Sequence, residues 1–232
     1  MPSVSCLMPC YNNAEYLTEA IQSLLNQTYK DFELIIVNDG STDSTDEIMD
    51  YFVKKDKRVK YFKNKKNEGI AKTRNIAFKH SKGEYIAIID ADDIYAPSKL
   101  KDALTAIKKV DIVYTPILNA DADGKVFAIT EVPKELDLET LRKGDQQIPH
   151  PSIVARRKVF DEHPYREEFK SNDDLMLIYD WYLADYKWKS ISKPSVIHRH
   201  YLTSTEVARK DESNKFGEMA KKIFEEGLKC KK

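Results

Sequence analysis

Three carboxylates follow directly on an apolar stretch of the chain. Residues 85–89 read Tyr-Ile-Ala-Ile-Ile, as in a buried strand, and Asp90, Asp92 and Asp93 come next. Alternate side chains of an extended segment share a face, so Asp90 and Asp92 should point one way and Asp93 the other. Paired carboxylates attract a hard divalent cation, which could bridge a diphosphate and act as a Lewis acid. The pattern therefore predicts a metal and diphosphate site at the end of this strand.

A second Asp-x-Asp occurs at Asp121 and Asp123. It lies between polar residues and precedes Gly124, a context typical of a turn. We therefore interpret this copy as a turn between two strands, without a role in metal binding.

Polar, turn-forming segments follow the other predicted strands of the first half. Gly40 and Gly69 would let the backbone approach a ligand closely. Tyr11 could stack on a base or ribose, Asp39 could accept a base N–H, and Arg74 could donate to a base or a phosphate. Together the segments describe a nucleoside diphosphate site. They are residues 8–13, 37–43 and 67–75.

A parallel sheet is needed to bring these segments together. Short apolar runs alternate with helix-period segments, which predicts an α/β fold with helices covering a parallel sheet. Ligands of such sheets bind beyond the carboxyl ends of the strands. The predicted strands are 4–8, 32–37, 59–62 and 85–89, and the predicted helices are 14–27, 43–55, 70–81 and 97–109.

The pattern loosens after residue 110. Residues 111–118 and 126–130 are predicted strands, joined through a hairpin turn at Asp123-Gly124. A helix is predicted over 174–186, and the tail from 206 to 232 is predicted to be a polar helix with one apolar stripe. The stripe consists of Phe216, Met219, Ile223, Phe224 and Leu228.

The composition narrows the function classes. Lys plus Arg and Asp plus Glu both number 38, so the chain lacks the basic excess of a nucleic-acid-binding protein. Cys6 and Cys10 are expected to be packing thiols, and the cysteine usage indicates a reducing compartment. No signal peptide or membrane-spanning run is visible, so a cytoplasmic protein is expected.

The motifs occur in the order and spacing of family 2 glycosyltransferases, which the chain resembles over roughly residues 3–200. The resemblance implies the GT-A fold, with a Rossmann-like half carrying a mostly parallel sheet and an acceptor half carrying a mixed sheet. Asn38 stands where the family usually has an acidic residue. The matching motifs are Pro9-x-Tyr11-Asn12, residues 38–43, Asn67-x-Gly69 with Arg74-Asn75, and Asp90-Ala91-Asp92-Asp93.

We accordingly expect a single domain over residues 1–205 and a C-terminal helical extension over 206–232. Within the domain, residues 1–110 should bind the nucleotide sugar and residues 111–205 the acceptor.

The resemblance also assigns roles on the donor side. It implies that Asp39 recognises a uracil, that Asp92 binds Mn²⁺ or Mg²⁺ directly, and that Asp90 lies nearer the ribose or sugar of the donor. A uridine diphosphate sugar is favoured. The implied donor-binding residues are Pro9, Tyr11, Asn12, Asp39, Gly69, Arg74, Asp90, Ala91 and Asp92.

On the acceptor side, Asp173 and Asp174 are similar to the Glu-Asp pair that carries the family's catalytic base. We expect Asp174 to be the base of an inverting transfer and Asp173 to be the alternative. The alternative, purely structural interpretation is that both carboxylates stand at the N-terminus of a helix, where they interact favourably with its dipole.

The late segment 198–200 resembles an Arg/His element of the family. One of its residues could meet the metal or the diphosphate. His198 and His200 are therefore candidate metal ligands, and Arg199 and His150 are candidate acceptor-side residues.

The expected function is transfer of a sugar from a nucleotide donor to a glycan or lipid-linked acceptor, in polysaccharide, glycolipid or surface glycan synthesis. A non-catalytic nucleotide-sugar-binding module and a sugar nucleotidyltransferase are the alternatives, although the latter normally has a Gly-rich, basic loop where this chain has residues 9–13. The striped tail is compatible with a homo-oligomer or with peripheral association at the inner face of a membrane.

Overall fold

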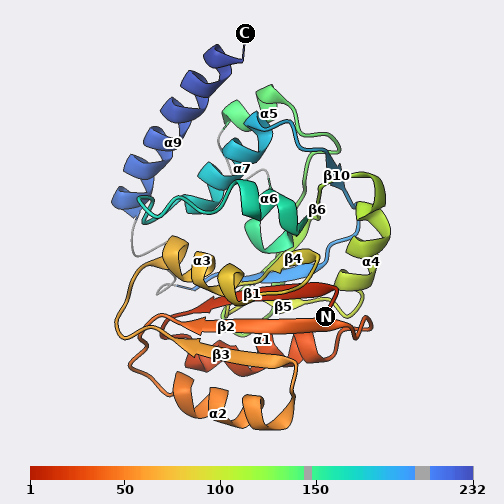
Figure 1. Ribbon diagram of the computed structural model, residues 1–232, viewed down its shortest axis with the longest axis vertical. Coiled ribbons are helices and arrows are strands. Elements are labelled where there is room, and N and C mark those ends of the chain that lie inside the picture. Colours follow the sequence, from red (N-terminus) through yellow and green to blue (C-terminus); the bar gives the residue numbers. More distant parts are fainter. Residues whose placement is uncertain (144–147, 202–209, 232) are drawn as a thin grey trace.

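The computed structural model describes residues 1–143, 148–201 and 210–231 (Figure 1). Its larger sheet has seven strands in the order β10-β6-β9-β4-β1-β2-β3. The four strands of the first half are mutually parallel, as predicted, and β9 lies antiparallel between β4 and β6. The strands are β1 (Val4–Cys10), β2 (Phe32–Asn38), β3 (Val59–Lys63), β4 (Tyr85–Ile88), β6 (Ile112–Tyr114), β9 (Val154–Arg156) and β10 (Trp188–Ser190).

Helices cover both faces of this sheet. Figure 1 shows α1 and α2 on one side and α3, α6 and α7 on the other. Parallel strands are connected through helices that lie on the faces of the sheet, and these helices bury the central strands on both sides. The helices are α1 (Ala14–Leu25), α2 (Thr45–Lys55), α3 (Ile70–His80), α4 (Lys99–Ala106), α5 (Leu138–Lys143), α6 (Arg157–Glu162), α7 (Asp173–Leu183) and α9 (Lys210–Cys230), with short 3-10 turns at Ile107–Lys109 and His150–Ser152.

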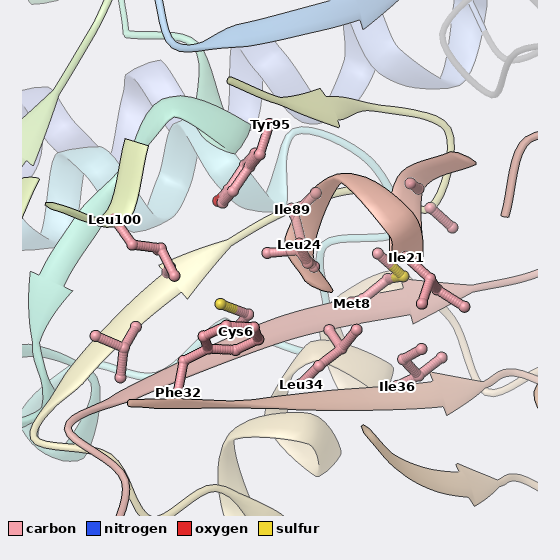
Figure 2. Close-up of a cluster of buried hydrophobic side chains, with 14 of the residues drawn as sticks. Cys6, Met8, Ile21, Leu24, Phe32, Leu34, Ile36, Ile89, Tyr95 and Leu100 are labelled. Atoms are coloured by element: carbon pink, nitrogen blue, oxygen red, sulfur yellow. The ribbon is translucent and has the colours of Figure 1, made fainter. Parts of the chain in front are cut away.

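The central strands carry the core. Every residue of β1 and β2 is buried, as the continuous apolar runs predict. Figure 2 shows Cys6 and Met8 of β1 beside Leu34 of β2, under side chains of α1 such as Leu24. Cys6 and Cys10 are buried, which confirms their expected place in the packing, whereas Cys230 is exposed.

A smaller mixed sheet lies beside the larger one, with the order β5-β11-β7-β8. The strand β11 is parallel to β7 and antiparallel to β5, and β7 and β8 form the predicted antiparallel hairpin through Gly124. The mixed sheet expected in the second half is therefore present. Its strands are β5 (Ile94–Tyr95), β7 (Ile117–Ala120), β8 (Val126–Thr130) and β11 (Val196–Arg199).

Several predicted boundaries were wrong. The strand predicted over 111–118 is two strands in different sheets, because the chain turns at Thr115-Pro116 and Pro116 has no N–H for a sheet ladder. The helix predicted from residue 43 begins at Thr45, since the Asp43 carboxylate accepts the Thr45 N–H at 3.1 Å. The helix predicted over 174–186 is α7, and Asp185 beyond its end has φ 60°.

The tail helix packs on the body of the protein. Phe224 of α9 is 1% exposed, and its ring stacks on Tyr179 of α7 with the centroids 4.2 Å apart. Most of the predicted stripe therefore faces α7, but Met219 is 39% exposed. Among the described residues, no helix has both the length and the apolarity to cross a membrane.

Candidate active site

A cavity of about 370 Å³ opens beyond the carboxyl ends of β1, β2 and β4. The small sheet and the segment leading into α7 form its other walls. All but one of the predicted site residues line this cavity, both those expected at strand ends in the first half and those implied by the resemblance in the second half. They are Pro9, Tyr11, Asp39, Gly69, Arg74, Asp90, Ala91, Asp92, His150, Asp173, Asp174, His198, Arg199 and His200.

Asn12 is the exception and lies outside the lining. Its backbone has φ 52°, and its Oδ1 accepts the Thr42 N–H at 2.9 Å. Its own N–H donates to Ser41 Oγ at 2.9 Å. Asn12 therefore links the loops after β1 and β2 by hydrogen bonds. It supports the cavity wall without facing the cavity.

Asp39 holds the loop that leads into α3. Its Oδ1 accepts from Asn64 Nδ2 at 2.7 Å and from the Glu68 N–H at 2.8 Å, and its Oδ2 accepts from the Gly69 N–H at 2.9 Å. The residue is 3% exposed and lines the cavity. A carboxylate has about four acceptor sites, so one remains for a ligand N–H.

Tyr11 and Gly69 both line the cavity. Tyr11 is 44% exposed, which leaves its ring open to a planar ligand. Gly69 has φ 95°, and a Cβ built there would meet no atom within 4 Å. A residue with a side chain would be strained at this φ, and its side chain would project into open space. Glycine therefore leaves that space open.

Arg74 is the hub of the buried charges. Its Nη2 donates to Asp90 Oδ1 at 2.9 Å and its Nη1 to Asp173 Oδ2 at 2.6 Å. The two carboxylates raise the pKa of Arg74 well above its ordinary value, although burial acts in the opposite direction. The sequence predicts that this guanidinium could donate to a base or a phosphate. In the structure it lines the cavity and is paired with two carboxylates.

Asp90 and Asp92 differ in their electrostatic environment. Burial by itself opposes ionisation of Asp90, but the Arg74 guanidinium brings the pKa of Asp90 below its ordinary value. Burial and the charge of Asp90 raise the pKa of Asp92. A cation beside Asp92 would offset this repulsion, so the two carboxylates are compatible with a divalent metal.

Asp93 does not line the cavity, but strand alternation is not the reason. Strand β4 ends at Ile88, and residues 90–93 form a turn in which the Asp93 N–H donates to the Asp90 carbonyl oxygen at 3.2 Å. Asp93 is fully buried, and its Oδ1 lies 2.9 Å from His198 Nδ1. Burial raises the pKa of Asp93 to about 7. His198 is thereby oriented through one ring nitrogen, which is the usual arrangement behind a histidine that meets a ligand with the other.

Asp173 and Asp174 open α7, and both line the cavity. Asp173 is 4% exposed and bound to Arg74. Asp174 Oδ1 accepts the Leu175 N–H at 2.8 Å, and its side chain is only partly buried. The residue before them, Asn172, has φ 54°, a strained conformation of the kind found at functional sites.

His150 is a neutral histidine in the cavity wall. Burial and the Arg74 charge lower the pKa of His150 well below its ordinary value. Its Nε2 lies 2.8 Å from Tyr165 Oη, while its buried Nδ1 has no hydrogen-bond partner among the described residues.

Arg199 is tied to the protein on both sides. Its Nη1 donates to the Asp92 carbonyl oxygen at 2.7 Å, and its Nη2 donates to Glu19. The guanidinium also lies 5.0 Å from the centroid of the Tyr16 ring. Arg199 lines the cavity but serves first to fix the backbone of Asp92.

Several residues of the site were not predicted from the sequence. Tyr201 donates from its hydroxyl to Asp92 Oδ2 at 2.6 Å, and burial with the Asp92 charge raises its pKa, so it remains a proton donor. Asn119 and Thr130 line the cavity from the small sheet. No local pattern marks these residues; the only signal was the place of Tyr201 directly after the His-Arg-His segment.

No preformed cluster of three or more His, Cys, Asp or Glu side chains suited to a metal occurs in the described part of the chain. A cation held by the Asp90 and Asp92 region would therefore need further ligand oxygens. A bound diphosphate would supply them, since phosphate oxygens commonly complete the shell of Mg²⁺.

Comparison with known proteins gives one consistent family. A family model described as glycosyl transferase family 2 matches residues 5–164. A glycosyltransferase of Haemophilus influenzae is 40% identical over 161 residues, which cover 68% of this chain and 64% of that protein. The chain spans less of some longer relatives, with 27% of a Rickettsia bellii glycosyltransferase.

Solved structures agree with the fold. TarS of S. aureus, residues 1–349 in complex with UDP-GlcNAc, has a TM-score of 0.73 and 25% identity, covering 86% of this chain and 59% of that one. A mannosyltransferase from Pyrobaculum calidifontis in complex with GDP-Man and Mn²⁺ has a TM-score of 0.65 at 18% identity, and it covers 88% of this chain and 58% of that one. At that identity the second likeness bears on the fold alone.

Proposed function

Because the chain belongs to glycosyl transferase family 2, we propose that it transfers a sugar from a nucleoside diphosphate donor to an acceptor hydroxyl with inversion at the anomeric carbon. One observation carries the proposal. Loops far apart in sequence bring Tyr11, Asp92 and Asp174 into a single cavity at the carboxyl edge of the sheet. Donor, diphosphate and acceptor would meet there.

The donor nucleotide would bind at the end of the cavity lined by Tyr11, Asp39 and Gly69. The exposed Tyr11 ring can stack on a base, and the remaining acceptor site of Asp39 can receive a base N–H. A uracil offers such an N–H. The UDP-GlcNAc bound by the structural relative TarS supports a UDP-sugar as donor.

A divalent cation, Mn²⁺ or Mg²⁺, would be held by Asp92 with Asp90 nearby and would neutralise charge on the departing diphosphate. The raised pKa of Asp92 beside a second carboxylate supports this placement. Tyr201 and Arg199 hold Asp92 from its carboxylate and its carbonyl oxygen, so the ligand would be oriented before the donor arrives.

Asp174 would be the catalytic base. Its carboxylate lines the cavity and is not the one locked to Arg74, whereas Asp173 is held by that ion pair at 2.6 Å. In the transfer, the acceptor oxygen forms a bond to the anomeric carbon while the bond from that carbon to the diphosphate oxygen breaks. Asp174 takes the hydroxyl proton, and the bonding pair leaves with the diphosphate.

The halves of the chain would divide this work. Residues 1–110 supply the carboxylates and loops of the donor side, and residues 111–205 supply Asp174 and the small sheet on the acceptor side. The acceptor would be a glycan or a lipid-linked glycan, as in polysaccharide, glycolipid or surface glycan synthesis.

Calorimetric titration and turnover test the proposal. UDP, GDP and dTDP are titrated with Mn²⁺, and UDP-sugars are then assayed for hydrolysis and transfer. Asp92→Asn should weaken UDP binding in Mn²⁺, while Asp123→Asn in the exposed turn should not. Asp174→Asn should keep UDP binding and lower transfer by about 10²–10⁴-fold. Asp180→Asn, a carboxylate of the same helix paired with Arg166, is the matched control.

The outcomes separate the alternatives. The proposal would be wrong if no nucleoside diphosphate bound. Donor binding without hydrolysis or transfer would favour a nucleotide-sugar-binding module. Release of pyrophosphate from a nucleoside triphosphate and a sugar phosphate would indicate a nucleotidyltransferase.

A further inference from the structure

The outer strand of the small sheet exposes a row of apolar side chains. In β8, Phe127 is 63% exposed and Ile129 is 52% exposed. Strand β8 pairs only with β7 in the described sheet, so its other edge and much of both faces meet solvent. An exposed aromatic ring beside an enzyme cavity has a cost in water and suggests a ligand that covers it.

A β-bulge gives Phe127 an orientation of its own. Asn119 pairs with Ala128 and Ala120 pairs with Val126, so Phe127 is the extra residue on β8. Such bulges re-aim a side chain and are frequent beside active sites. The Phe127 ring lies against His200, with the centroids 5.9 Å apart and the rings tilted by 56°.

His200 connects this ring to the cavity. It lines the cavity, and its Nε2 lies 2.9 Å from Asn119 Oδ1. Asn119 in turn donates from Nδ2 to Thr130 Oγ1 at 2.8 Å. All three side chains line the cavity, so the small sheet presents a fixed row of polar groups that ends at the exposed ring of Phe127.

Ile129 serves as the internal contrast. It pairs with Leu118, whereas the flanking residues Ile117 and Asn119 are the ones that line the cavity. Because alternate residues of a strand face opposite sides, Ile129 lies on the face away from the cavity. Both side chains are therefore exposed, but only Phe127 lies beside the cavity.

We propose that Phe127 is the platform on which a pyranose ring of the acceptor stacks, so that the acceptor is a saccharide. The C–H face of a pyranose is apolar and matches an aromatic ring, while its hydroxyls need donors and acceptors such as those of Asn119, Thr130 and His200. The small sheet offers both chemistries side by side. The inference rests on the proposed glycosyl transfer and names a residue that would hold a sugar ring of its acceptor.

The test uses the full chain and methyl pyranosides of glucose, galactose, mannose and N-acetylglucosamine as probes. Binding is measured by saturation-transfer NMR, with and without UDP and Mn²⁺. At least one methyl glycoside should bind, with the strongest saturation on protons of one ring face. Phe127→Ala should weaken that binding by about two- to tenfold, the range of a single aromatic contact. Phe127→Tyr should retain it.

The controls separate this inference from the proposed function. Ile129→Ala should bind the same glycoside as the unaltered chain does, and UDP affinity should be equal in all variants. Absence of glycoside binding in the unaltered chain, or equal binding by Phe127→Ala, overturns the platform. A third result also overturns it: octyl glucoside binds more tightly than methyl glucoside, and Phe127→Ala loses only this difference in affinity. The ring would then bind a lipid chain and not a sugar. Failure of UDP to bind counts against the proposed function, and the glycoside result still decides the platform.

Discussion

A buried lysine offers a sharp test of how the site is held. Lys99 on α4 is 2% exposed, and its Nζ donates to the Ser152 carbonyl oxygen at 2.7 Å. It lies 3.3 Å from Ser195 Oγ and 4.7 Å from the centroid of the Tyr95 ring. Burial lowers the pKa of Lys99 from 10.5 to about 7. The amine therefore fixes the 3-10 turn that carries His150 into the cavity wall.

The lowered pKa determines how stability should depend on pH. Between pH 7 and 10.5 the unfolded chain holds a proton on Lys99 that the folded chain has released, so this residue makes stability rise with pH. From these two pKa values its contribution should increase by about 3 kcal/mol between pH 7 and 9.5. Lys99→Met removes the contribution. At pH 7 it removes an ionisation penalty of about 4 kcal/mol but leaves the Ser152 carbonyl unpaired, at about 1–3 kcal/mol.

Urea unfolding followed by circular dichroism at pH 7, 8, 9 and 9.5 measures the difference. The Lys99→Met variant should be the more stable protein at pH 7, and the unaltered chain should gain on it by about 3 kcal/mol by pH 9.5. Lys101→Met, an exposed lysine of the same helix, should follow the unaltered chain. The reasoning would be refuted if the difference in unfolding free energy between Lys99→Met and the unaltered chain stayed constant from pH 7 to 9.5, within about 0.5 kcal/mol.

Three further expectations concern packing. Gly40→Ala should destabilise the protein more than Gly69→Ala in urea unfolding. Both positions have positive φ, which costs a residue with a side chain about 1–3 kcal/mol, but only at Gly40 would the new Cβ also lie 2.7 Å from a backbone carbon. Equal losses in the two variants would contradict this. Phe224→Ala should cost about 3–5 kcal/mol in thermal unfolding, since the ring is buried against α7, and a loss below about 1 kcal/mol would count against that packing. A thiol reagent should label Cys230 in the native protein and spare Cys10, whose burial raises its pKa to about 12; rapid native labelling of Cys10 would be inconsistent with that burial.

Local sequence pattern was enough to locate the strand ends. Buried apolar runs followed by polar turns placed Asp39 and Asp92 at one edge of a parallel sheet, because strand direction fixes where such residues meet. The break at Pro116 was missed because the apolar run continues across it. Periodicity describes one segment at a time and cannot tell which sheet a strand joins.

Contacts between distant segments could not be predicted in the same way. The partners of Arg74, Asp90 and Asp173, lie 16 and 99 residues away in the sequence. Tyr201 lies 109 residues from Asp92. The bulge at Phe127 depends on the register of two strands, which an exposed apolar sequence specifies only weakly.

The buried ion pairs of Arg74 link the two sides of the proposed site. Arg74 belongs to α3, Asp90 follows β4, and Asp173 begins α7, so one guanidinium joins the nucleotide-side sheet to the helix that carries Asp174. Loss of the cation would leave the buried Asp173 carboxylate and the partly buried Asp90 carboxylate without their partner, which costs more than loss of a surface pair. The start of α7 is thus held from α3, while Phe224 of α9 packs against the body of the same helix. The position of the proposed base therefore depends on a cation from the opposite half of the chain.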